Sequence, residues 1–84
     1  MKRPTQEGIN QEFNNLLGGY TITYEAIMKE ENIEKIKDFY LGKFQDTYSR
    51  LFEMAICYNL EGSLRNIIPK FINVANKLGI PHTL

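Results

Sequence analysis

The chain has 84 residues, of which 43% are hydrophobic and 24% charged, a composition typical of one small folded domain. Ten basic and ten acidic residues cancel, which argues against the large positive excess that usually drives binding to nucleic acid or anionic lipid. A single cysteine excludes an internal disulfide framework, and no apolar run approaches the length of a membrane span. We therefore expect a cytoplasmic protein that does not bind membranes.

The first predicted helix covers residues 5–17. Its apolar residues Ile9, Phe13, Leu16 and Leu17 follow the spacing i, i+4, i+7 and i+8 of one helix face. Thr5 is suited to cap its start, and Gly18-Gly19 is expected to end it.

A second helix is predicted over 23–31. Thr23 can cap it, with Ile22 and Ile27 at the positions of a hydrophobic staple. Asn32 can cap a new helix, although propensity alone leaves open whether residues 23–60 form one helix or two.

The third predicted helix, 33–60, is long and apolar on more than one face. Helical spacing joins Ile33 to Tyr58, and the segment 51–60 is almost entirely apolar or aromatic. Gly42 lies in the middle of this run and indicates a break, a kink or a close helix crossing.

The last predicted helix covers 64–78 and has the clearest amphipathic stripe. Pro69 lies inside it, so the helix either begins near Pro69 or is kinked there. Gly79 and Pro81 are expected to end it.

Together these elements predict an all-α single domain over 1–84, a small bundle in which the long central helix and the C-terminal helix form an antiparallel hairpin. The N-terminal helices are expected to lie across this hairpin. Residues 1–4 and 80–84 are expected to be flexible or extended ends.

No group of residues has the pattern of an active site, so we expect a protein that is not an enzyme and needs no cofactor or metal. His82 is the only histidine and is expected in a solvated tail. Cys57 is expected to pack in the core. Glu30, Glu34 and Asp38 form an acidic row that lysines partly neutralise, as on a solvated helix face.

The two-sided apolar helix predicts association, because a short chain has few other helices with which to cover both sides. We expect a homodimer, in which identical surfaces pair across a two-fold axis. The residues expected in self-association are Tyr40, Phe44, Tyr48, Leu51, Phe52 and Ile56, and those expected to contact a protein partner are Tyr20, Tyr24 and Met28. The predicted function is that of a small regulator, inhibitor or adaptor that binds through a helical surface.

The alternative is a regulator associated with nucleic acid. Asn66, Lys70, Asn73 and Lys77 line one side of the last helix, where their amides and amines could bind phosphates or base edges. Any soluble helix is polar opposite its apolar stripe, so this pattern is weak.

Overall fold

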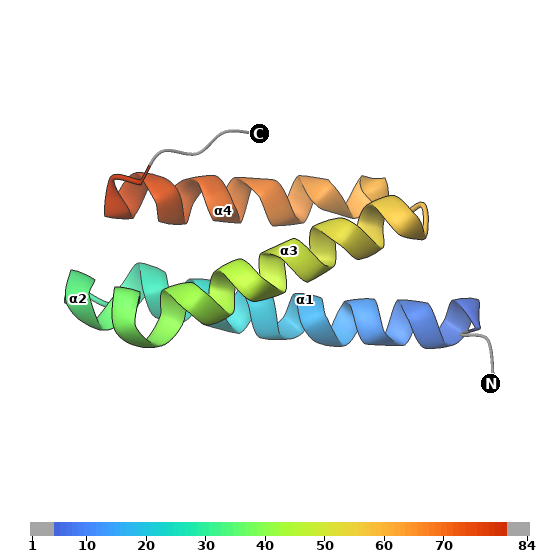
Figure 1. The fold of residues 1–84 in the computed structure, drawn as a ribbon, viewed down its shortest axis with the longest axis horizontal. Helices are drawn as coiled ribbons and strands as arrows, with labels where there is room; N and C mark the ends of the chain where they lie inside the picture. Colours follow the sequence, from blue (N-terminus) through green and yellow to red (C-terminus); the bar gives the residue numbers. More distant parts are fainter. Residues whose placement is uncertain (1–4, 81–84) are drawn as a thin grey trace.

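The structure, a computed structural model, describes residues 5–80 and consists of three long helices packed side by side (Figure 1). In chain order the elements are α1 (Gln6–Lys29), α2 (Ile33–Lys35), the π-helical turn η1 (Ile36–Tyr40), α3 (Leu41–Cys57), the 3-10 turn η2 (Glu61–Ser63) and α4 (Leu64–Leu78). The all-α prediction is confirmed, and so is the antiparallel hairpin of α3 and α4 (Figure 1). Residues 1–4 and 81–84, including His82, lie outside the described residues, so the expectations for these ends are not followed further.

α1 is one continuous helix, so the predicted end at Gly18-Gly19 and the predicted new start at Thr23 are wrong. The apolar stripe that begins at Ile9 continues past the two glycines to Tyr20 and Ile27, which are both buried. The threonine hydroxyl bonds within the helix instead of capping it, since Thr23 Oγ1 donates to the Gly19 carbonyl at 2.9 Å. Packing of this long stripe therefore outweighs the low helix propensity of two exposed glycines.

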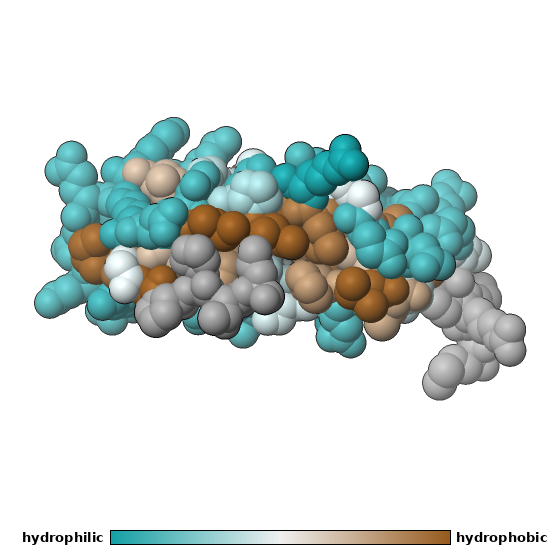
Figure 2. Space-filling model, turned by 90° about the horizontal axis from the view of Figure 1, so that it is seen from above, coloured by the Kyte–Doolittle hydropathy of each residue, from teal (hydrophilic) through white to brown (hydrophobic). Residues whose placement is uncertain are grey.

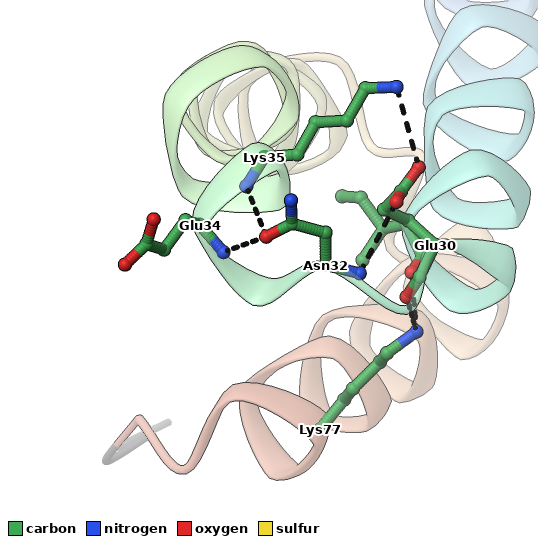
Figure 3. A network of polar contacts seen from close by, with 6 residues as sticks. Glu30, Asn32, Glu34, Lys35 and Lys77 are labelled. Atoms are coloured by element: carbon green, nitrogen blue, oxygen red, sulfur yellow. Dashed lines mark hydrogen bonds and ion pairs between the residues drawn. The ribbon is translucent and has the colours of Figure 1, made fainter.

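The start of α1 and the start of α2 are capped as predicted. Thr5 Oγ1 accepts from the backbone N–H of Gly8 at 3.0 Å. Asn32 Oδ1 accepts from the N–H groups of Glu34 and Lys35 at 3.0 and 3.3 Å (Figure 3). The chain therefore leaves α1 and starts a new helix at Ile33, which settles the question of one helix or two over residues 23–60.

The helix over 33–57 is not regular, because η1 interrupts the α-helical hydrogen bonding between α2 and α3. The N–H of Leu41 donates to the carbonyl of Ile36, five residues earlier, so this turn holds one more residue than an α-helical turn. Gly42 follows directly, but a Cβ added there would have no neighbour within 4 Å, which rules out a close crossing at this glycine. The irregularity predicted near Gly42 is thus a π turn, and it leaves Phe39 71% exposed.

α3 and α4 end in the same way, with one residue in the left-handed conformation. Asn59 has φ 59° and Gly79 has φ 68°. The next residue then closes the helix end, since Leu60 N–H donates to Ala55 O at 2.8 Å and Ile80 N–H donates to Ala75 O at 2.9 Å. α3 therefore stops at Cys57 rather than at residue 60, whereas the predicted end of α4 is confirmed.

α4 begins at Leu64 and runs through Pro69, so the alternative start predicted near Pro69 is wrong. Pro69 is exposed, so its ring does not face the packed side of the helix. Two residues earlier, the carbonyl of Ile67 accepts a hydrogen bond from the buried Tyr20 hydroxyl at 2.8 Å, which ties α4 to α1 next to the proline.

Stacked aromatic rings join the three helices at the centre of the bundle. Tyr20 of α1 stacks on Phe44 of α3 at 4.6 Å between ring centroids, and Tyr48 of α3 stacks on Phe71 of α4 at 4.2 Å. Phe44 and Phe71 are in turn parallel at 6.3 Å. These contacts fix which side of each helix faces inward, and hence which sides remain outside.

Candidate interaction surface

A bundle of three helices has three outer seams, one between each pair of helices, and here the three differ in chemistry. The seam between α1 and α4 is polar and closed by hydrogen bonds. Lys77 Nζ on α4 donates to three backbone carbonyls at the end of α1, those of Ile27, Met28 and Glu30, at 2.7, 2.9 and 2.6 Å. Figure 3 shows the bond to Glu30. A cation at the carboxyl end of a helix also interacts favourably with the helix dipole, so Lys77 acts as a cap supplied by another helix.

The same seam engages the other polar side chains of α4. Asn73 Nδ2 donates to the Tyr24 hydroxyl at 3.0 Å, and Lys70 Nζ lies 5.8 Å from the centre of the Tyr24 ring. Lys70 also donates to the Asn66 carbonyl at 3.1 Å. The face expected to bind nucleic acid is therefore turned toward α1, where Asn73 and Lys77 already have partners.

The seam between α1 and α3 carries charge. Arg50 and Glu12 form an exposed ion pair at 2.8 Å, and this carboxylate raises the pKa of the Arg50 guanidinium. A hollow of about 140 Å³ adjoins this pair, lined by Glu12, Arg50, Glu53, Met54, Cys57 and Tyr58. Cys57 is exposed here, so its predicted place in the core is wrong; the helix turns it toward this seam, away from the buried Leu51 and Ala55.

The seam between α3 and α4 is apolar. We call it the α3–α4 surface and define it by the partly or largely exposed residues Phe52, Ile56, Leu64, Ile68 and Ile72. Phe52 is 37% exposed and Ile56 51%. Tyr48 stacks on Phe71 beneath them, and its ring lies 6.0 Å from that of Phe52. In the antiparallel register set by Tyr48 and Phe71, Phe52 is level with residues 67–68 of α4, and Ile56 with residues 63–64.

The direction of Ile68 and Ile72 follows from the contacts of α4. Lys70 and Lys77 face α1, and at 100° per residue Ile68 and Ile72 fall on the opposite side of the helix. Figure 2 shows apolar atoms along the long axis of the molecule, bordered on one side by a hydrophilic row. The α3–α4 surface is therefore an elongated apolar strip that α1 does not cover.

The residues predicted for self-association divide into two groups. Phe44 and Leu51 are completely buried inside the chain, and Tyr40 and Tyr48 are half-buried against the core, so these four are used mainly for folding. Phe52 and Ile56 lie on the α3–α4 surface. Sequence reasoning did not assign the α4 half of this surface, although Ile72 gives a signal, because it is an isoleucine outside the main apolar stripe of its helix.

The residues predicted for a partner contact do not form one surface. Tyr20 is completely buried, and burial raises the pKa of its hydroxyl, with Tyr48 and Tyr24 contributing. Tyr24 is half-buried in the seam between α1 and α4, and only Met28 is exposed. These three residues therefore do not contribute to the α3–α4 surface.

The acidic row near the start of α2 takes part in local contacts. Glu30 accepts from the backbone N–H of Asn32 at 3.2 Å, and its carboxylate lies 3.8 Å from Lys35 Nζ (Figure 3). Within residues 5–80, no group of three or more His, Cys, Asp or Glu side chains is arranged to hold a metal ion.

Comparisons of this chain with protein-family models, with curated proteins and with solved structures find no match. In the part of the chain that the structure describes, no helix combines the length and the apolar character needed to span a bilayer.

Proposed function

We propose that this protein is a non-enzymatic interaction module, a small cytoplasmic regulator, inhibitor or adaptor that binds another protein chain through the α3–α4 surface. The observation that supports this most directly is the apolar strip itself, which follows two helices and contrasts with the charged and hydrogen-bonded seams on either side of α1. Contiguous apolar patches on soluble proteins commonly mark sites of protein interaction. Two parallel ridges of isoleucine and phenylalanine on adjacent helices form a shape into which a further helix can pack.

Two aspects of the sequence fit this proposal. The single cysteine suits a reducing compartment such as the cytoplasm. The equal numbers of acidic and basic residues suit a surface that recognises apolar groups rather than phosphates. The nucleic-acid alternative gains no support from the geometry, since Lys77 and Asn73 bond to α1.

The experiment is to compare the proteins that the immobilised chain captures from the host lysate before and after a charge is placed on the strip. Ile56→Glu puts a carboxylate on the α3–α4 surface at a largely exposed helical position, where folding should tolerate it. Ile22→Glu is the matched control, because Ile22 is 70% exposed on α1, outside this surface. We expect mass spectrometry to find proteins retained by the wild type and by Ile22→Glu but lost from Ile56→Glu. Identical capture by all three would contradict the proposal.

A further inference from the structure

We propose that the α3–α4 surface is covered by a second copy of this chain, packed face to face across a two-fold axis. This inference rests on the proposed function and names the partner of the same surface. The four helices α3 and α4 of one copy and α3 and α4 of the other then enclose a shared apolar layer, with each α1 on the outside.

The exposure of the strip is the first argument. Phe52 and Ile56 are 37% and 51% exposed, and Leu64, Ile68 and Ile72 are each partly exposed. Removing the exposed part of such side chains from water is favourable, so covering both copies of the strip stabilises a dimer.

The shape of the chain is the second argument. Its extents are 44 × 22 × 18 Å and its radius of gyration is 13.8 Å, whereas a compact domain of this length is expected to have a radius of gyration of roughly 12 Å. The apolar strip runs along the long axis (Figure 2), so pairing through it places two elongated molecules side by side. That arrangement makes the assembly more compact than either copy, as expected when one bundle is completed by another.

The distribution of charge is the third argument. The residues that make up the strip are all apolar, and its neighbours Gln45 and Ser49 on α3 are uncharged. Of the nearest charged side chains along the helices, Glu53 lines the hollow in the seam between α1 and α3, and Arg65 is exposed at the start of α4, at one end of the strip. Interfaces commonly have such an apolar centre with charges outside it. A two-fold axis therefore brings no like charges together in the centre, and the zero net charge of each copy removes long-range repulsion between them.

The test is the mass of the purified full-length chain in solution, measured by light scattering after size exclusion at concentrations from about 1 µM upward, where many protein interfaces form. We expect a mass near twice 9.8 kDa. Ile56→Glu and Ile72→Glu, which change α3 and α4 separately, should each raise the dissociation constant at least about 30-fold, as expected when a central apolar contact is lost. Ile22→Glu should leave the dimer unchanged.

A wild-type chain that stays monomeric at all concentrations overturns the inference, whether or not the variants fold. A dimer that both Ile56→Glu and Ile72→Glu leave intact, with native circular dichroism, overturns it as well, because the interface must then lie elsewhere. The proposed function is tested separately, by the capture experiment described above. If the wild type is monomeric but Ile56→Glu still loses captured proteins, only the identity of the partner is wrong.

Discussion

The two sides of α4 show how differently one helix can be used. Toward α1, Asn73 and Lys77 of this helix end in hydrogen bonds, three of them from the single ammonium group of Lys77. On the opposite side, Ile68 and Ile72 of the same helix are partly exposed on the α3–α4 surface, together with two side chains of α3. The polar side of an amphipathic helix is thus packed here, while part of its apolar side is left uncovered. The hydrophobic pattern of a helix indicates what can be buried, but the neighbouring helices decide what is buried.

Phe44 should be the strongest test of the core that supports both sides of α4, because its ring lies between Tyr20 and Phe71. Phe44→Ala leaves a cavity where the three helices meet, and we expect it to lower the free energy of unfolding by about 3 to 5 kcal/mol. Urea unfolding followed by circular dichroism measures this loss. Phe39→Ala, the same change at an exposed ring, should alter stability by less than about 0.5 kcal/mol. Equal effects of the two changes would contradict the core as described.

Lys77→Met tests the hydrogen-bonded seam between α1 and α4 directly. The methionine keeps most of the apolar stem but removes the ammonium group, leaving the carbonyls of Ile27, Met28 and Glu30 without that donor. Hydrogen bonds from a charged group are worth more than neutral ones, so we expect a loss of about 1.5 to 3 kcal/mol in the free energy of unfolding.

The matched control for Lys77→Met is Lys70→Met, since Lys70 lies on the same face of α4 but donates to an exposed carbonyl of its own helix and lies over the Tyr24 ring. Its effect should be below about 1 kcal/mol, the value of an exposed cation–π contact. A similar cost for both lysines, in urea titrations at the same salt concentration, would show that Lys77 does not cap α1.

Replacing the two glycines inside α1 should stabilise the folded chain without changing the α3–α4 surface. Gly18 and Gly19 lie inside α1, and an added Cβ at either would have no neighbour within 4 Å. Gly18→Ala and Gly19→Ala should each raise the free energy of unfolding by about 0.5 to 1 kcal/mol. Gly79→Ala should lower it by about 1 kcal/mol, because Gly79 has a positive φ that alanine adopts with strain. Destabilisation by the α1 substitutions would mean that the two glycines end the helix after all.

Tyr20→Phe should have a small effect at neutral pH and a distinctive one in alkali. Loss of the hydrogen bond to the Ile67 carbonyl is expected to cost about 0.5 to 1.5 kcal/mol. Burial raises the pKa of Tyr20 above that of a tyrosine in the unfolded chain. Above about pH 10 the unfolded chain therefore releases this proton while the folded chain keeps it, so stability falls as the pH rises.

The alkaline loss of stability should be shallower in Tyr20→Phe than in the wild type, with part of it remaining because burial also raises the pKa of Tyr48. Unfolding midpoints measured between neutral pH and about pH 11 would show the difference. Parallel pH profiles for the two proteins would contradict the buried position of the Tyr20 hydroxyl.

Local signals in the sequence predicted the parts of the fold that local chemistry controls. Thr5, Asn32 and Gly79 cap helices where their side chain, or the lack of one, favours a cap. The helix ends predicted at Gly18-Gly19 and at residue 60, next to Asn59, were wrong for opposite reasons. Long-range packing of Tyr20 and Ile27 carried α1 through two weak helix formers, whereas an asparagine able to adopt a positive φ ended α3 early.

Only the α3 half of the α3–α4 surface could be predicted from the sequence. Phe52 and Ile56 could be recognised because the third predicted helix has more apolar side chains than one face can bury. Phe44 and Leu51, on the same predicted stripe, could not be separated from them without knowing that α1 and α4 enclose them. The role of Lys77 also depends on contact with residues about 50 positions earlier in the chain, which periodicity within one helix does not report.

The π turn at Ile36–Tyr40 has a consequence for the tolerance of this chain to changes in length. Because the turn holds one residue more than an α-helical turn, deleting a single residue there can be absorbed by closing the turn to α-helical geometry. α2 and α3 would then both keep their facing directions, because the residue removed is the extra one that the turn holds. Residues 36–40 are therefore where this helix could lose a residue while the registration of the downstream core, from Phe44 to Ala55, is kept.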